Sequence, residues 1–313
     1  MKCRTCGRPA VINMRQHKLA LCADHYLDWF VRQTERTIRK YRMFTPEARI
    51  LVAVSGGKDS LALWDVLLRL GYHADGLYID LGIDGGLDYS HQSRAKAEAF
   101  AAAHPETRLI IVDIPATYGE SIPQVAARTL RGRQRPCSVC GLVKRHEMNR
   151  IALEEGYDVL ATGHNLDDEV AVLFGNTMQW KVGYLQRQGP VLPADAQGLA
   201  RKVKPLCRFY ERETAAYALL RGIDYIYDEC PFSKGATSLR YKELLAQMEH
   251  HSPGAKLHFY IHFLKAKEEG LFCPEEQTRP PMHPCERCGQ PTTAPGLCAF
   301  CRLWVRKEEA GGG

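Results

Sequence analysis

Apolar residues in the middle of the chain form short continuous runs that alternate with stretches of helical spacing. The run Arg49–Val54 reads as a buried strand of a parallel sheet, and residues 61–70 carry apolar side chains at helical spacing. The alternation extends from about residue 48 to 230. It predicts an α/β protein with a doubly wound parallel sheet and a ligand at the carboxyl ends of the strands. Further strands are expected at 73–79, 108–114, 157–161 and 224–227, and further helices at 27–41, 90–103 and 144–155.

The pattern changes on both sides of this region. A linker-like segment at 44–47 precedes it, and residues 237–270 are expected to be helical. The chain therefore divides into four expected parts: an N-terminal module with a basic helix (1–44), a nucleotide-binding catalytic domain (45–235), a helical extension (236–272) and a C-terminal module (273–313).

The composition is ordinary for a globular protein, with 45% hydrophobic and 25% charged residues, but the chain holds twelve cysteines. No apolar run approaches the roughly 18 residues of a membrane helix. The opening residues, Met1 to Arg4, lack the apolar core of a secretory signal. We therefore expect a cytoplasmic protein. In that reducing compartment, clustered Cys-x-x-Cys spacing indicates metal or redox chemistry and not disulfides.

Eight residues near the two ends form two sets of four metal ligands. Each set consists of two knuckles of soft or borderline donors, as a closed tetrahedral zinc site requires. Neither set leaves a coordination position open, so we expect two structural zinc ions that fold modules with little core of their own. The first set is Cys3, Cys6, Cys22 and His25, and the second is Cys285, Cys288, Cys298 and Cys301.

The cysteines in the middle of the chain are arranged differently. Cys137 and Cys140 form a single knuckle, and Cys230 is the nearest candidate partner, far along the sequence. Three cysteines are incomplete as a structural zinc site and would leave one position free on an iron–sulfur cluster. A redox pair and ordinary buried thiols are the other interpretations that the spacing leaves open. Cys207 and Cys273 stand alone and are expected to be buried structural thiols.

The positive charge is concentrated at the N-terminus. Residues 1–44 carry ten Lys and Arg against three acidic residues, in a chain whose total formal charge is +6. A local excess of this kind suits a polyanion such as nucleic acid, because neutralised phosphates release counterions. A solvated basic face is the alternative that charge alone cannot separate from it.

Two loops that follow predicted strands carry the candidate nucleotide chemistry. In the first, glycines let backbone N–H groups close on an anion, hydroxyls add donors, and a helix N-terminus follows. The second holds clustered carboxylates, which suit Mg²⁺ beside a triphosphate, although Asn165 or Asp167 could equally serve as a helix cap. Of these carboxylates, Asp168 is expected to face the nucleotide. The first loop is Ser55-Gly56-Gly57-Lys58-Asp59-Ser60 and the second is Thr162-Gly163-His164-Asn165-Leu166-Asp167-Asp168-Glu169.

Taken together, these motifs resemble the PP-loop ATP pyrophosphatases, and among them the tRNA 2-thiouridine synthetases of the TtuA and Ncs/Ctu type. The resemblance covers essentially the whole chain. It consists of the two terminal ligand sets, the loop at 55–60, Pro136-Cys137-Ser138-Val139-Cys140-Gly141, Gly163-His164-Asn165-Leu166-Asp167-Asp168, and Cys230 in Glu229-Cys230-Pro231.

This resemblance implies a set of cofactors and site residues. Cys137, Cys140 and Cys230 would hold a 4Fe–4S cluster with one open iron, and sulfur would come from a ubiquitin-like protein ending in a thiocarboxylate. Lys144, Asp168 and Asp59 are the implied catalytic residues, with Mg²⁺ near the two aspartates. The implied ATP contacts are Ala53, Ser55, Gly56, Gly57, Lys58, Asp59, Ser60, Ile79, Gly163 and Asp168. The implied tRNA contacts are Arg128, Arg131, Arg133 and Arg135, with Arg201, Lys202, Lys204 and Arg208.

The implied reaction adenylates the C2 carbonyl of a tRNA uridine, expected to be 5-methyluridine 54 in the T loop, and then replaces its oxygen with sulfur. Alternatives are 2-thiolation of wobble uridine 34, 2-thiocytidine synthesis, and a cluster-free mechanism in which Cys140 and Cys230 form a persulfide. A non-enzymatic RNA-binding protein is a further alternative, which the intact loop at 55–60 disfavours. A homodimer is expected from the resemblance alone.

Overall fold

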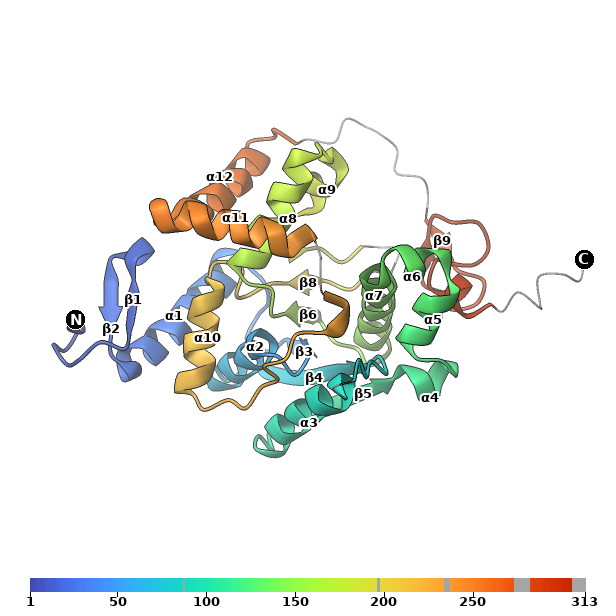
Figure 1. Ribbon diagram of the computed structural model, residues 1–313, viewed down its shortest axis with the longest axis horizontal. Coiled ribbons are helices and arrows are strands. Elements are labelled where there is room, and N and C mark those ends of the chain that lie inside the picture. The colour runs from blue at the N-terminus through green and yellow to red at the C-terminus, as the bar shows by residue number, and fades with distance from the viewer. Residues whose placement is uncertain (87, 196–197, 234–236, 273–281, 306–313) are drawn as a thin grey trace, which may run out of the picture.

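The computed structural model describes the chain except residues 87, 196–197, 234–236, 273–281 and 306–313. Its centre is a six-stranded sheet in the order β5-β4-β3-β6-β8-β7 (Figure 1). All neighbouring strands are parallel except β7, which runs antiparallel to β8 at one edge. The strands are β3 (Arg49–Val54), β4 (His73–Asp80), β5 (Leu109–Asp113), β6 (Val159–Thr162), β7 (Val191–Leu192) and β8 (Lys202–Val203).

Helices cover both faces of this sheet, and a separate core lies on each face. The helices α2 (Lys58–Arg69) and α3 (Tyr89–Ala102) contribute Leu61 and Phe100 to one core, whereas α7 (Pro136–Glu154) contributes Val143 to the other. Strand β3 supplies both cores, because successive side chains of a strand point to opposite faces. The expected doubly wound α/β fold is confirmed, with one antiparallel edge strand.

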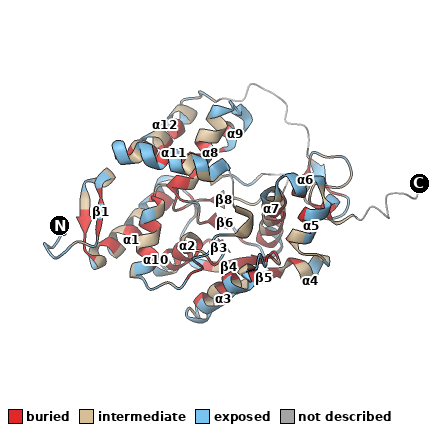
Figure 2. Cartoon of the chain, viewed as in Figure 1, coloured by how far each residue is buried: buried red, intermediate tan, exposed pale blue. Residues whose placement is uncertain are grey.

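The remaining helices complete the two layers. In Figure 2, strands β3 and β4 and helix α2 are largely buried, whereas α11 presents an exposed face. Five further helices lie on the side of α2: α1 (Ala23–Lys40), α8 (Leu166–Met178), α10 (Glu211–Leu220), α11 (Thr237–His251) and α12 (Ala255–Glu268). The shorter helices are α4 (Ile114–Tyr118), α5 (Ile122–Arg128), α6 (Leu130–Gln134) and α9 (Val182–Arg187).

Three expected elements differ in the structure. Residues 224–227 form no strand, because Ile226 donates a single backbone hydrogen bond to Gly56 O (2.9 Å) instead of joining a ladder. The helix expected at 144–155 begins at Pro136, so the knuckle cysteines lie in its first turns. The helical region 237–270 is interrupted between α11 and α12, where Gly254 has a φ of 100°.

Two small modules lie at opposite ends of the molecule (Figure 1). The N-terminal one is a hairpin of β1 (Ile12–Met14) and β2 (Leu19–Leu21) around η1 (Arg15–His17), followed directly by α1. The C-terminal one contains β9 (His283–Pro284), β10 (Pro291–Thr292) and η3 (Cys301–Trp304). The expected boundary at 235–236 and the start of the last part at 273 fall on residues outside the described part of the chain.

No helix among the described residues has the length and apolar composition to cross a membrane.

Candidate active site at the switch point of the sheet

The glycine-rich loop lies where the strand order reverses. Strands β4 and β5 extend from one side of β3, and β6 and β8 extend from the other, so the carboxyl ends of β3 and β6 open onto a crevice. Gly56 adopts a φ of 73°, and a Cβ there would meet Ser93 O at 2.2 Å. Only glycine can occupy this position, because both the backbone conformation and the space exclude a side chain.

Hydrogen bonds within the loop hold its shape. Ser55 N donates to Ser60 Oγ (3.1 Å), and Ser60 Oγ in turn donates to Gly57 O (2.9 Å). The second loop approaches so closely that a Cβ on Gly163 would lie 2.8 Å from the carbonyl carbon of Asp59. The two predicted loops therefore form one continuous backbone surface at the N-termini of α2 and α8.

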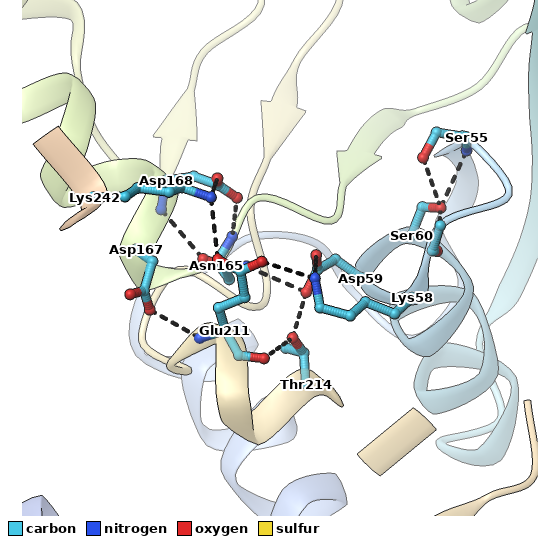
Figure 3. Close-up of polar contacts among 11 residues, drawn as sticks. Ser55, Lys58, Asp59, Ser60, Asn165, Asp167, Asp168, Glu211, Thr214 and Lys242 are labelled. Atoms are coloured by element: carbon cyan, nitrogen blue, oxygen red, sulfur yellow. Dashed lines mark hydrogen bonds and ion pairs between the residues drawn. The ribbon is translucent and has the colours of Figure 1, made fainter. Parts of the chain in front are cut away.

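Asp59 and Asp168 belong to one polar network that joins the two loops (Figure 3). Asn165 caps α8 by accepting from Asp168 N (3.2 Å), while Asp168 Oδ2 accepts from Asn165 N (3.1 Å). The Asn165 amide also donates to Asp59 Oδ1 (3.2 Å), and Thr214 Oγ1 donates to the same oxygen. Burial raises the pKa of Asp59, although the neighbouring Lys58 acts in the opposite direction.

Two lysines neutralise this network from either side of Glu211, at the start of α10. Lys58 Nζ lies 2.9 Å from Glu211 Oε1 and 3.1 Å from Asp59 Oδ2. Lys242 Nζ lies 2.6 Å from Asp168 Oδ1 and 3.2 Å from Glu211 Oε2. Burial opposes the charge of Lys58, but Asp59 and Glu211 raise its pKa overall. Both ammonium groups therefore stay charged beside the loop.

A cavity of 570 Å³ extends from the first loop to α7 and brings most of the predicted site residues together. The three predicted catalytic residues meet here, because Asp59, Asp168 and Lys144 all line the same cavity. Gly56, Gly57 and Lys58 are not among the lining residues, since the glycines turn the backbone and Lys58 points to Glu211. The other predicted residues that line the cavity are Ala53, Ser55, Ser60, Ile79, Gly163, Cys137, Cys140 and Cys230.

The three middle cysteines line one end of this cavity although Cys230 is remote in sequence. Cys140 is buried, Cys230 is half-buried, and the Cys137 thiol donates to Phe232 O (2.9 Å). Burial raises the pKa of Cys140 to about 11, with Cys230 adding to the shift and Lys144 opposing it. The ammonium group of Lys144 is therefore placed where it favours the thiolate form of these cysteines.

The arginines predicted to contact tRNA do not all remain free. Arg128 is bound bidentately to Glu120 and donates to Leu303 O (2.6 Å), so it holds the C-terminal module in place. Arg131, Arg133 and Arg135 are exposed and make no ion pair with any described residue. In the second set, Arg201 donates to Met43 O and Arg42 O, and Lys204 pairs with buried Glu169 (2.8 Å). Lys202 alone of that set lines the cavity.

The two terminal ligand sets each converge in space, and each could hold a metal ion. The ligand atoms of Cys3, Cys6, Cys22 and His25 lie within 4.8 Å of one another, as do those of Cys285, Cys288, Cys298 and Cys301. In both modules a glycine with positive φ follows the first knuckle, Gly7 at 75° and Gly289 at 70°, and its N–H donates to the carbonyl of the first cysteine. Among the described residues, the three middle cysteines do not converge in this way.

Both modules pack on elements that carry the site. Tyr26 Oη donates to Glu213 O (2.5 Å), and the ring of Phe30 stacks on Tyr217, so the N-terminal module is fixed to α10. The C-terminal module covers α7: the ring of Phe300 stacks on His146 at 3.5 Å, and His146 Nε2 lies 3.5 Å from Cys288 Sγ. The C-terminal module thus supports α7, which lines the cavity, and the N-terminal module supports α10, which carries Glu211 and Thr214.

Several functional neighbours have no motif in the sequence. Glu211, Thr214 and Lys242 join the site from α10 and α11, which reach it only through packing. Arg145 follows Lys144 and also lines the cavity. Asn165, one of the two residues expected as a possible helix cap, forms a capping box with Asp168 at the start of α8. Cys207 is fully buried away from the cavity, as expected, and Cys273 lies outside the described residues.

A glycine-rich turn at the switch point of a doubly wound sheet defines a nucleotide-binding α/β protein. Residues 28–241 match the PP-loop domain family, and residues 2–27 match the N-terminal LIM domain of the 2-thiouridine synthetase TtuA. The chain belongs to the PP-loop family and, within it, to the 2-thiouridine synthetases of the TtuA type. The resemblance drawn from the motifs is thereby confirmed.

Named relatives agree with this membership. The chain is 54% identical over 304 residues to the tRNA-5-methyluridine(54) 2-sulfurtransferase of Thermus thermophilus, which covers 97% of this chain and 91% of that protein. It is 43% identical over 313 residues to the enzyme of the same name from Thermotoga maritima, covering 99% and 98%. The U34-tRNA thiolase NcsA of Methanococcus maripaludis, solved with its 4Fe–4S cluster, has the same fold, with a TM-score of 0.78. The two sequences are 22% identical, and the match covers 97% of this chain and 95% of that one.

Proposed function

We propose that this protein is an ATP-dependent tRNA 2-sulfurtransferase whose target is 5-methyluridine 54. The observation that carries the proposal is the single cavity in which the PP-loop, three cysteines and Lys144 meet. The two relatives that share 54% and 43% identity over nearly the whole chain are both named for this reaction. A thiolation requires that the base be activated by ATP and then attacked by sulfur. The cavity brings the PP-loop, for the first step, and the three cysteines, for the second, to one place.

In the proposed reaction, the O2 atom of the uridine attacks the α-phosphorus of ATP, and pyrophosphate leaves. The C2–O2 oxygen then belongs to an AMP ester, which is a good leaving group. Sulfide attacks C2, AMP departs with the original oxygen, and the base is left as a 2-thiouridine. The PP-loop and the N-terminus of α2 would hold the phosphates, because Ser55, Asp59 and Ser60 line the cavity and the N-terminus of a helix attracts anions.

Asp59 and Asp168 supply the hard oxygen donors that Mg²⁺ prefers, from two loops at the same edge of the sheet. Both carboxylates are neutralised by Lys58 and Lys242, so a bound Mg²⁺–triphosphate would compete with these ammonium groups for them. Lys144 makes no ion pair with a described residue and is thereby free to stabilise negative charge that develops on phosphate or base.

Cys137, Cys140 and Cys230 suit a 4Fe–4S cluster, because they offer three thiols at one end of the cavity and leave a fourth coordination position without a cysteine. When bound, such a cluster supplies an open iron that can carry sulfide. The contribution of the chain is to hold the thiolates near Lys144, which lowers the cost of their negative charge. The terminal sets would hold zinc, since cysteine and histidine donors in closed groups of four suit that ion.

The remaining parts of the proposal concern partners. A ubiquitin-like protein with a C-terminal thiocarboxylate would deliver the sulfur, and the enzyme would act as a homodimer in the cytoplasm, where its tRNA substrate is found. These assignments follow from the family. Thiolation assays with and without the carrier protein test the first, and light scattering of the purified protein tests the second.

The decisive experiment uses anaerobically purified protein, unmodified tRNA containing 5-methyluridine 54, ATP and a sulfur source. Nucleoside mass spectrometry should find 2-thio-5-methyluridine in the wild-type reaction and lose it with Cys137→Ala. Cys207→Ala is the matched control, because that thiol is buried outside the cavity. Thiolation at position 34 in place of 54 would redirect the proposal to the wobble base, and full activity of Cys137→Ala would exclude the cluster.

A cluster-free mechanism is the second candidate, since Cys140 and Cys230 both line the cavity. Iron analysis separates the two. About four irons per chain and a brown colour support the cluster, whereas a colourless and active protein supports a persulfide.

A further inference from the structure

The cations in or beside the cavity form two groups with different partners. Lys58 and Lys242 lie on the side of α10 and are paired with Glu211, Asp59 or Asp168. Lys202 and Arg145 lie on the side of β8 and α7, and among the described residues neither has a carboxylate within ion-pair distance. The neighbouring Lys204 and Lys256 are paired with Glu169 and Asp167, whereas Lys202, like Lys144 on the cavity wall, makes no ion pair with a described residue.

An unpaired cation in a partly closed site is unfavourable unless a ligand brings the opposite charge. Lys202 is half-buried and lies beside two further cations, Lys204 and Arg145. Burial, together with these two like charges, lowers the pKa of Lys202 to about 8. Arg145 reaches the surface, but partial burial of its guanidinium, followed by the nearby charge of Arg131, lowers the pKa of that group as well. In the part of the chain that the structure describes, Lys202 and Arg145 therefore lie near other cations and have no carboxylate in an ion pair with them.

The position of the cluster indicates which anion it receives. The PP-loop and the N-terminus of α2 lie on the side of Lys58, and the proposed function already assigns the triphosphate of ATP to them. The unpaired cations instead continue outward: Arg145 is exposed, and the charge of Arg131 on α6, which packs on α7, acts on it (Figure 1). A line of cations from the surface to the cavity matches a strand of successive phosphates better than one nucleotide.

Exposed aromatic side chains lie on α9 and just before it. Tyr184 on α9 acts on the charge of Arg145 and is 59% exposed, and Trp180 just before α9 is 72% exposed. Lys181 and Arg187 lie over the Tyr184 ring at 5.9 and 5.2 Å from its centroid. Exposed aromatic rings beside cations are the surface on which single-stranded bases stack, and they complete the features of an RNA path.

We propose that Lys202 and Arg145 form a phosphate site for the RNA backbone next to the target uridine, with Arg131 and Tyr184 at its entrance. The site rests on the proposed function, because it presumes that a tRNA uridine enters the cavity. It fixes the strand by a phosphate contact and leaves base recognition to other groups. The triphosphate of ATP is the other source of the same chemistry, and the two sources are separable by experiment.

The test measures two affinities on the anaerobically prepared full-length protein: that of unmodified tRNA as a function of salt, and that of ATP with Mg²⁺. Lys202→Met should weaken tRNA binding about tenfold, the scale of one charged hydrogen bond, and lower the salt slope by about one. ATP affinity should stay unchanged, and Lys202→Arg should restore tRNA binding. Lys265→Met is the matched control, because Lys265 is an exposed lysine on α12.

Lys202→Met should fold normally, since no carboxylate loses its partner, and thermal unfolding checks this. If ATP binding weakens instead of tRNA binding, the anion is the nucleotide and the RNA site is wrong. If Lys202→Met binds both tRNA and ATP with wild-type affinity, the RNA phosphate site is also wrong. The wild-type thiolation reaction serves as a separate reference. Absence of thionucleoside there would refute the proposed function, whereas thiolation with unimpaired tRNA binding by Lys202→Met would refute only the phosphate site.

Discussion

Replacing Gly163 by alanine should weaken ATP binding while leaving the fold intact. A Cβ at this position would lie 2.8 Å from the carbonyl carbon and oxygen of Asp59 and 2.9 Å from Ser60 N. These are backbone atoms of the PP-loop, so no side-chain rotation can relieve the contact and the two loops must separate. Overpacking of this kind costs about 1–3 kcal/mol. If the cost falls on the nucleotide-binding conformation, ATP affinity drops between about fivefold and a hundredfold.

Isothermal titration with a non-hydrolysable ATP analogue and Mg²⁺ measures this change. Gly183→Ala is the matched control, because nothing lies within 4 Å of its Cβ position on exposed α9. That control should bind the analogue like wild type and gain up to about 1 kcal/mol from helix propensity. Wild-type affinity in Gly163→Ala would refute the reasoning, since it would mean that the loops separate without affecting the nucleotide.

Three further predictions concern the elements that support the site. His146→Ala removes the ring that stacks on Phe300 and contacts Cys288 Sγ, so the C-terminal metal should be released to a chelator about 10- to 100-fold more readily; an unchanged release rate would contradict this. Phe30→Ala removes a buried ring stacked on Tyr217 and should cost about 3–5 kcal/mol in urea unfolding, whereas a loss under 1 kcal/mol would show that the packing contributes little. Burial raises the pKa of Asp75, but hydrogen bonds from Tyr157 and Arg108 lower that pKa overall. Ionised Asp75 therefore stabilises the folded state fully above about pH 4, and this stabilisation is lost as the pH falls through the folded-state pKa. The stability difference between wild type and Asp75→Asn should therefore shrink on acidification, and a difference that grows would contradict the assignment.

Local sequence determined the modules and the loops. The terminal ligand sets could be predicted because each knuckle spans only four residues, and the first knuckle of each set is closed by a glycine turn at Gly7 or Gly289. The PP-loop could be predicted because its strand, turn and helix are contiguous from β3 to α2. The alternation of buried runs and amphipathic helices likewise predicted the layers, since it reflects which faces are covered. The error at 224–227 arose because three consecutive apolar and aromatic residues cannot distinguish a strand from a segment that crosses the PP-loop.

Tertiary structure decided which remote residues meet. Cys230 reaches Cys137 and Cys140 only because the segment after α10 crosses the carboxyl edge of the sheet. Glu211 and Lys242 enter the nucleotide site from helices with no motif, and Arg128 is removed from the expected tRNA surface by Glu120. Lys204 pairs with the carboxylate of Glu169, whereas its neighbour Lys202 makes no ion pair with a described residue. Such pairings depend on how whole elements pack against one another, and a charge pattern read along the chain contains no information about which partner lies across the sheet.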